Sequence, residues 1–85
     1  MIPNAEKGLY NVFYGPSMQT ATPLAANCTV SEARHYMKDY IRSNYPRLLT
    51  TPNRVWSENG VLYIDFGASE YIMIPGMPEK TWLNK

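Results

Sequence analysis

The stretch TVSEARHYMKDYIRSNY, residues 29–45, has the start, the apolar stripe and the end of an amphipathic helix. Thr29 and Glu32 have the spacing of a capping box, in which each side chain satisfies a backbone N–H of the other residue. Pro46 ends the helix because it disfavours a helical conformation at the residue before it and has no N–H to donate. The sequence therefore predicts a helix over about residues 30–44.

One face of this helix is apolar. Val30, Ala33, Met37 and Ile41 recur at intervals of three or four residues, and this periodicity predicts that they lie on a single stripe. An apolar stripe of this width needs an apolar partner, and we expect that partner to be a sheet.

The second half of the chain predicts a three-stranded meander. The segments 54–58 and 61–66 flank Asn59-Gly60, the pair best suited to a two-residue type I′ turn. This turn places Trp56 opposite Tyr63 and Arg54 opposite Asp65, the latter as a cross-strand ion pair. A third strand over 70–75, after a three-residue loop, brings its isoleucines onto the aliphatic face of the hairpin.

The first half predicts two further strands. Residues 9–14 are rich in aromatic and β-branched side chains and predict a strand, with Tyr10, Val12 and Tyr14 on one face. Residues 15–17 predict a turn, and residues 19–24 predict a returning strand that Pro23 confines to an edge. The fold class is therefore α+β: a small antiparallel sheet of about four to five strands, order β-β-α-β-β-β, with the helix on one face. We expect one domain over residues 1–85, with loose ends at 1–7 and 76–85, the latter able to pack back through Trp82 and Leu83.

Composition excludes several classes of function. The 85 residues contain 8 Lys and Arg against 7 Asp and Glu, so neither a polyanion nor a polycation is indicated. Cys28 has no disulfide partner, and one Cys with one His cannot form a four-ligand zinc site. His35 lies two helical turns beyond Cys28, too far for a catalytic dyad. We therefore predict no metal, no cofactor and no catalytic residue, and hence a protein that is not an enzyme.

No apolar run approaches the roughly 20 residues of a membrane span, and the N-terminus MIPNAEKG lacks the apolar core of a signal peptide. The expected location is the cytoplasm of a host cell, without membrane contact.

The predicted register turns large side chains away from the helix, and these form the first candidate surface. Its members are Trp56, Val61, Tyr63, Tyr71 and Met73. So many large apolar groups need a cover. The chain's own ends could supply it, as could another protein or a second copy, since Trp, Tyr and Met are common in interfaces. Stacked nucleobases are a further reading, although interleaved Lys and Arg are lacking.

Arg34, Lys38 and Arg42 follow each other at four-residue intervals and form the second candidate surface, here called the basic stripe; Arg47 extends it. An ordinary solvated face explains such a stripe, and so does contact with an acidic protein patch or with the phosphates of a nucleic acid. His35 is expected to pair with Asp39, one turn further along the same helix.

Together these features predict a non-enzymatic inhibitor or adaptor that binds a protein partner. The narrower hypothesis is a virus- or mobile-element-encoded protein that blocks a host defence or nucleic-acid-processing complex, as anti-CRISPR proteins do. The partner-binding residues would be Arg34, Lys38, Arg42, Arg47, Trp56, Tyr63, Tyr71 and Met73. Two alternatives are a nucleic-acid-binding regulatory domain that uses the basic stripe, and a structural subunit that forms a homodimer through the aromatic face of the sheet.

Overall fold

A computed structural model describes residues 8–83. In order along the chain, its elements are β1 (Tyr10–Gly15), the short 3-10 helix η2 (Met18–Thr20), β2 (Thr22–Cys28), α1 (Val30–Asn44), β3 (Arg54–Glu58), β4 (Val61–Asp65), β5 (Tyr71–Pro75) and α2 (Glu79–Leu83). This is the α+β arrangement that the sequence predicts.

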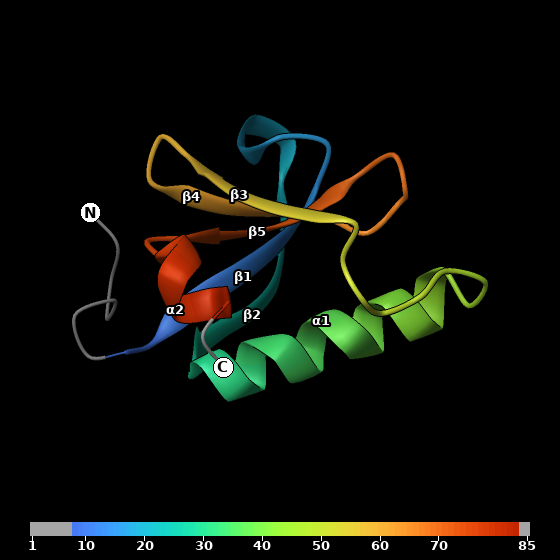
Figure 1. The fold of residues 1–85 in the computed structure, drawn as a ribbon, viewed down its shortest axis with the longest axis horizontal. Coiled ribbons are helices and arrows are strands. Elements are labelled where there is room, and N and C mark those ends of the chain that lie inside the picture. Colours follow the sequence, from blue (N-terminus) through green and yellow to red (C-terminus); the bar gives the residue numbers. More distant parts are fainter. Residues whose placement is uncertain (1–7, 84–85) are drawn as a thin grey trace.

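The five strands form one antiparallel sheet in the order β2-β1-β5-β4-β3. The long helix α1 crosses one face of this sheet, and the short helix α2 lies beside the beginning of α1 (Figure 1). Strand β5 is central because it pairs with both β1 and β4. The sheet therefore joins the first two strands and the last three into a single layer.

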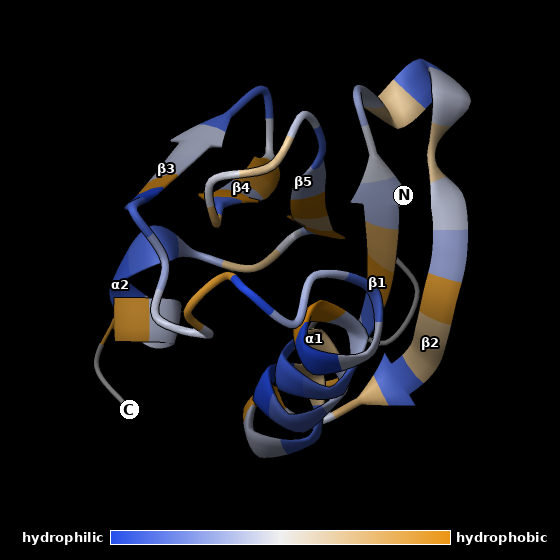
Figure 2. Ribbon diagram, turned by 90° about the vertical axis from the view of Figure 1, so that its right-hand side faces the viewer, coloured by the Kyte–Doolittle hydropathy of each residue, from blue (hydrophilic) through white to orange (hydrophobic). Residues whose placement is uncertain are grey.

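Helix α1 begins and ends as predicted. The Glu32 backbone N–H donates to the Thr29 hydroxyl at 3.2 Å, and the Thr29 N–H donates to the Glu32 carboxylate at 2.9 Å, which completes the capping box. Ala33, Met37 and Ile41 are its buried residues. Figure 2 views the molecule nearly along this helix and shows its hydrophilic side turned away from the sheet.

The hairpin of β3 and β4 has the predicted register in every pair, including Trp56 opposite Tyr63 and Arg54 opposite Asp65. Asn59 and Gly60 both have positive φ, at 53° and 78°, as a type I′ turn requires. Strand β5 pairs Ile72 with Ile64, which confirms the predicted register. The predicted three-residue loop is too short, because β4 ends at Asp65 and β5 begins at Tyr71, so residues 66–70 connect the strands. The predicted ion pair is wrong, because Arg54 contacts the Trp56 ring and the Asp65 carboxylate accepts the N–H of Gly67.

The second strand lies further along the chain than predicted. Strand β2 runs from Thr22 to Cys28, whereas residues 18–20 form η2. Alanine has a low strand propensity, but Ala25 and Ala26 are in a strand here because β2 pairs with β1 as far as Tyr10 and Cys28. Long-range pairing overrides the local preference. The register between β1 and β2 shifts twice. Pro23 lies on this edge strand, as predicted.

The prediction of a loose C-terminal segment over 76–85 is wrong for residues 76–83. Met77 is buried, and residues 79–83 form α2 with Trp82 buried in the core. The predicted return of the tail is thereby confirmed for Trp82, whereas Leu83 remains 60% exposed. The prediction for residues 1–7 lies outside the described residues.

The core lies between α1 and the inner face of the sheet. Its sheet residues are mainly aliphatic, as predicted, and the beginning and end of the described chain add aromatic and sulfur-containing side chains. The buried residues of this cluster are Tyr10, Val12, Cys28, Ala33, Met37, Ile41, Leu62, Ile64, Phe66, Ile72, Ile74, Met77 and Trp82.

We expect Thr29→Ala to lower the free energy of unfolding by about 1 kcal/mol, because it removes the acceptor for a backbone N–H at the start of α1. Ser31→Ala is the matched control: it removes a hydroxyl from the same turn that makes no hydrogen bond among residues 8–83. Urea denaturation of the three proteins measures both effects. Equal stability of Thr29→Ala and the unmodified chain would contradict the assigned cap.

Candidate functional site

Three aromatic rings gather on the sheet face opposite α1, and with Met73 they form what is here called the aromatic surface. The rings of Trp56 and Tyr63 stack, with centroids 5.3 Å apart and an interplanar angle of 11°. Tyr71 meets both rings edge-on, at 5.7 Å from Trp56 and 6.3 Å from Tyr63. All three side chains are half-buried. This geometry confirms that they share the outer face.

The four members of the aromatic surface are not equally available. Met73 is completely buried and is paired with Phe13 on β1 and with Tyr63 on β4, so it has no exposed surface for a partner. The Trp56 ring has the Arg54 guanidinium over it at 4.3 Å, and its indole N–H donates to Glu58 at 3.2 Å. The rings are therefore held rigidly by the chain itself.

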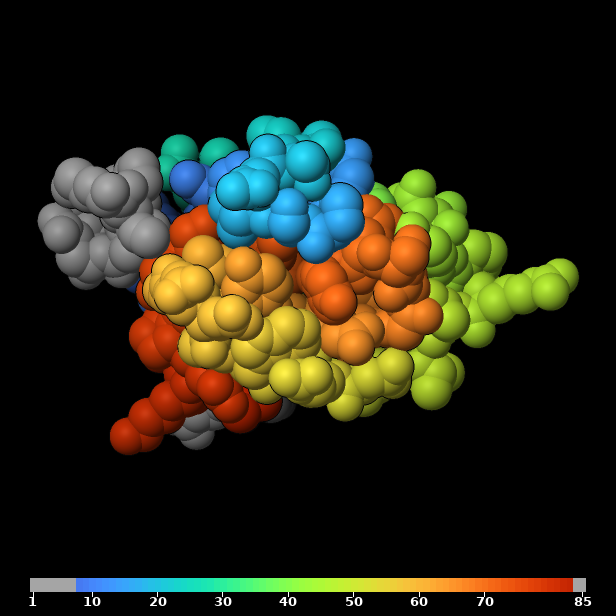
Figure 3. Space-filling model, turned by 90° about the horizontal axis from the view of Figure 1, so that it is seen from above, coloured from blue at the N-terminus to red at the C-terminus, as the bar shows by residue number. Residues whose placement is uncertain are grey.

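The C-terminal segment does not cover the aromatic surface. Trp82 belongs to the core on the α1 side of the sheet, so the idea that Trp82 and Leu83 lie over the outer face is wrong. Figure 3 views the molecule from above, where β3, β4, the segment around β5 and the β1–β2 connection form the middle of the visible surface, with the chain after α1 at one end and α2 at the other. The idea that the N-terminal residues form the cover falls outside the described residues.

The basic stripe divides into two parts. Lys38, Arg42 and Arg47 are exposed and form no ion pair among residues 8–83, which matches the prediction of a solvated cationic face. His35 pairs with Asp39 at 3.3 Å, as predicted. Arg34 differs from the other cations of the stripe because it is half-buried.

Arg34 holds α2 against α1. Its guanidinium lies over the Trp82 ring, 4.2 Å from the centroid, and donates a hydrogen bond to the Trp82 backbone carbonyl. Burial lowers the pKa of this guanidinium from its ordinary value. The contact joins residues that are 48 positions apart in the sequence. Arg34 thus has a structural role that the helical spacing alone does not indicate.

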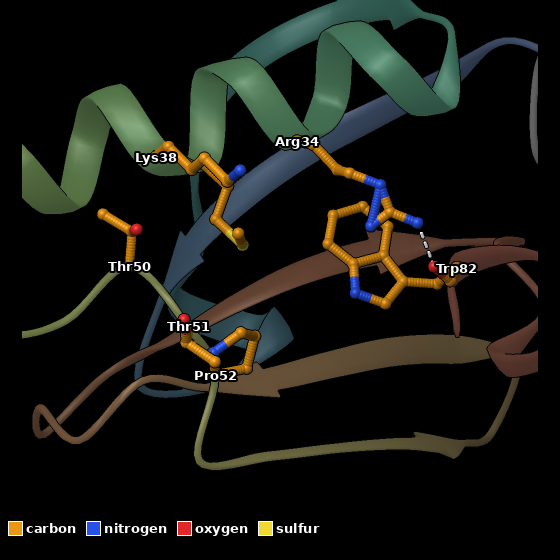
Figure 4. Close-up of a pocket in the computed structure, with 7 residues that line it drawn as sticks. Arg34, Lys38, Thr50, Thr51, Pro52 and Trp82 are labelled. Atoms are coloured by element: carbon orange, nitrogen blue, oxygen red, sulfur yellow. Dashed lines mark hydrogen bonds between the residues drawn. The ribbon is translucent and has the colours of Figure 1, made fainter. Parts of the chain in front are cut away.

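A groove runs beside this contact, between α1, the loop before β3, and α2. It consists of two adjoining hollows of about 280 and 410 Å³ that share Arg34, Pro52 and Trp82. Figure 4 shows the first hollow, with Lys38 and Arg34 on the helix side and Thr50, Thr51 and Pro52 on the loop side. The second adds Asn53, Arg54, Val55 and Leu83. We call the two hollows together the basic groove, since none of their lining residues is acidic.

Sequence reasoning identified only two lining residues of this groove as binding residues, Arg34 and Lys38. The sequence predicts an ion pair between Arg54 and Asp65, and it places Trp82 in the C-terminal segment. No pattern in the sequence links the three segments, because α1, the loop and α2 meet only in the folded chain. The helical spacing therefore groups Arg34 with Lys38, but it does not reveal that Arg54 joins Arg34 in the same groove.

A hydrogen-bonded cluster lies at the other end of α1. The Tyr40 hydroxyl donates to the Glu70 carboxylate at 2.6 Å, and the Tyr45 hydroxyl donates to the same oxygen. Burial, followed by the bond to Glu70, raises the pKa of Tyr40, whereas that bond is the main cause of the raised pKa of Tyr45. The cluster ties the end of α1 to the start of β5.

Reactive or metal-binding groups are sparse in the described part of the chain. Burial raises the pKa of the Cys28 thiol, which opposes formation of a nucleophilic thiolate. Residues 8–83 hold no group of three or more His, Cys, Asp or Glu side chains that could bind a metal ion. Within the same residues, neither helix has the length and apolar character needed to cross a membrane.

Comparison with protein-family models, with curated proteins and with solved structures finds no match to this chain. Function is therefore inferred from the two surfaces themselves.

We expect the contribution of Tyr40 to stability to disappear at alkaline pH. Its pKa is raised in the folded state, whereas an unfolded tyrosine ionises near pH 10, so the contribution is complete below about pH 10 and is lost above it. Tyr40→Phe should cost about 1–2 kcal/mol near neutral pH. Phenylalanine cannot ionise, so the gap between the two proteins should shrink on going from about pH 9 to pH 11. Chemical denaturation at each pH measures the gap, and a constant gap would contradict the assignment.

Proposed function

We propose that this protein is a non-enzymatic binding protein whose aromatic surface contacts a protein partner. The observation that supports this most is the rigid group formed by Trp56, Tyr63 and Tyr71 on a sheet face that α1 and α2 leave open. Tryptophan and tyrosine are the residues most enriched among interface hot spots, and rigid aromatic rings lose little conformational entropy on binding.

The surroundings of Trp56 favour a protein over a nucleic acid as the partner of this surface. Tyr63 and the Arg54 guanidinium already contact the Trp56 ring, and a nucleobase needs a free ring face on which to stack. Arg54 is also the only cation on β3, β4 and β5, whereas single-stranded nucleic acids are bound by grooves with many cations. A protein interface does not need either feature.

Nucleic-acid binding and homodimer formation are two further candidate functions, each supported by one observation. Nucleic-acid binding is supported by three exposed cations that could contact phosphates, Lys38, Arg42 and Arg47. The aromatic surface could also join two copies of this chain, because an isologous interface needs only one self-complementary patch.

We expect Trp56→Ala to reduce capture of a protein partner by about tenfold or more, because it removes the central ring of the aromatic surface. Tyr36→Ala is the control, since Tyr36 is a 43%-exposed aromatic residue on α1, away from the surface. Tagged proteins are incubated with nuclease-treated and untreated bacterial lysate, and the captured proteins are quantified by mass spectrometry. Circular dichroism verifies that each variant is folded.

Three outcomes would contradict the proposal in different ways. Equal capture by Trp56→Ala and the unmodified chain would exclude the aromatic surface as the contact. Capture that vanishes after nuclease treatment would favour nucleic-acid binding. A concentration-dependent dimer in sedimentation, lost in Trp56→Ala and present without any captured protein, would favour the homodimer.

The narrower proposal is that the partner belongs to a host defence or nucleic-acid-processing complex and that binding blocks it, as an anti-CRISPR protein would. Its support is the presence of two surfaces suited to contact with a partner, the aromatic surface and the exposed cations of the basic stripe. Adding the purified protein to the captured complex and measuring that complex's activity tests the inhibition.

A further inference from the structure

The basic groove combines several positive charges with a set of hydrogen-bond donors. Arg34 and Lys38 line its first hollow, and Arg54 joins Arg34 in the second. None of these cations forms an ion pair among residues 8–83. Because no acidic side chain lines either hollow, the positive potential there is not neutralised locally. The groove therefore favours a negatively charged occupant.

Trp82 adds a donor that has no acceptor. Only 3% of the residue is exposed, yet the indole N–H makes no hydrogen bond among residues 8–83. Every fully buried polar side-chain atom of the described chain has a partner, so this N–H is not fully buried. Trp82 lines both hollows of the groove. Figure 4 shows the nitrogen edge of the indole turned toward the loop at Pro52. An unpaired N–H that faces a cationic groove is suited to an anionic acceptor.

Arg34 is held ready for such an acceptor. One of its N–H groups donates to the Trp82 carbonyl, and the guanidinium is stacked on the Trp82 ring. The other donors of the planar guanidinium make no hydrogen bond among residues 8–83. Because the side chain is already fixed, binding a carboxylate through these donors would cost little side-chain entropy.

We propose that the basic groove binds an acidic peptide segment of a protein partner, with a carboxylate held between Arg34, Lys38 and the indole N–H of Trp82. This inference rests on the proposed protein-binding function and adds the chemistry of the partner. The groove is a second contact region beside the aromatic surface. Arg54 belongs to both, because it lines the groove and its guanidinium lies over the Trp56 ring.

The lining favours a peptide over a free phosphate or a nucleic acid. Met37, Pro52, Val55 and Leu83 contribute apolar surface between the cations, and apolar surface can pack against the side chains and backbone of a peptide. Thr50, Thr51 and Asn53 supply both donors and acceptors, which suits a peptide backbone, whereas phosphate oxygens only accept hydrogen bonds.

The test uses the full chain and a blocked peptide of about ten residues in which glutamate alternates with serine, compared with the same peptide carrying glutamine for glutamate. Isothermal titration calorimetry should show at least about tenfold weaker binding of the glutamine peptide. In nitrogen-15 NMR, the indole N–H signal of Trp82 should shift on addition of the glutamate peptide. The signal of Trp56 should move less than that of Trp82, since the Trp56 N–H is bonded to Glu58, which does not line the groove.

Lys38→Glu and Arg42→Glu form a matched pair of variants. Both reverse one exposed charge on α1, but only Lys38 lines the groove. We expect Lys38→Glu to weaken binding of the glutamate peptide by about tenfold or more and Arg42→Glu to weaken it by no more than about twofold. Arg34 is left unchanged, because its substitution would release α2.

Equal weakening by the two variants, or an unmoved Trp82 signal, would overturn the inference in favour of nonspecific charge attraction. Displacement of the peptide by inorganic phosphate or by a short oligonucleotide at equal charge concentration would overturn it in favour of a phosphate site. These outcomes concern the groove alone. Loss of the proposed function itself would be seen in the lysate experiment with Trp56→Ala, which leaves Arg34, Lys38 and Trp82 of the groove in place.

Discussion

The two-residue turn at Asn59 and Gly60 is the constraint on which the rest of the structure depends. Its positive φ values fix the register of β3 against β4, and the register decides which side chains meet α1. A shift by one residue would exchange the two faces of β3. The aliphatic core and the aromatic surface are therefore two consequences of one turn. Because β5 pairs with β4, its side chains are divided between the same two faces of the sheet.

Much of the fold could be predicted because its signals are local. The capping box of α1, the turn at Asn59-Gly60 and the alternation along β3, β4 and β5 each lie within a few residues of the element they define. The bounds of β2 could not be predicted, because they depend on pairing with β1. Helix α2 has only five residues, and what stabilises it is the burial of Trp82 against Arg34, which no local pattern reveals.

The candidate site was predictable only in part for the same reason. Strand alternation placed Trp56, Tyr63 and Tyr71 together correctly, since cross-strand neighbours follow from register. Helical spacing placed Arg34 and Lys38 on one side of α1, but it could not show that Arg34 is engaged by the C-terminal segment. The basic groove combines three segments, so its existence follows from tertiary packing alone.

The outer strands of the sheet differ from its centre in a way that limits how this protein can associate. Pro23 and the two register shifts interrupt the row of hydrogen-bonding groups along β2, while β3 has only five residues and carries charges at both ends, Arg54 and Glu58. Interrupted, short or charged edges resist the addition of a foreign strand. The chain can thus display large aromatic rings without also offering a template for fibril growth, and recognition is left to side chains, whose identity can discriminate among partners.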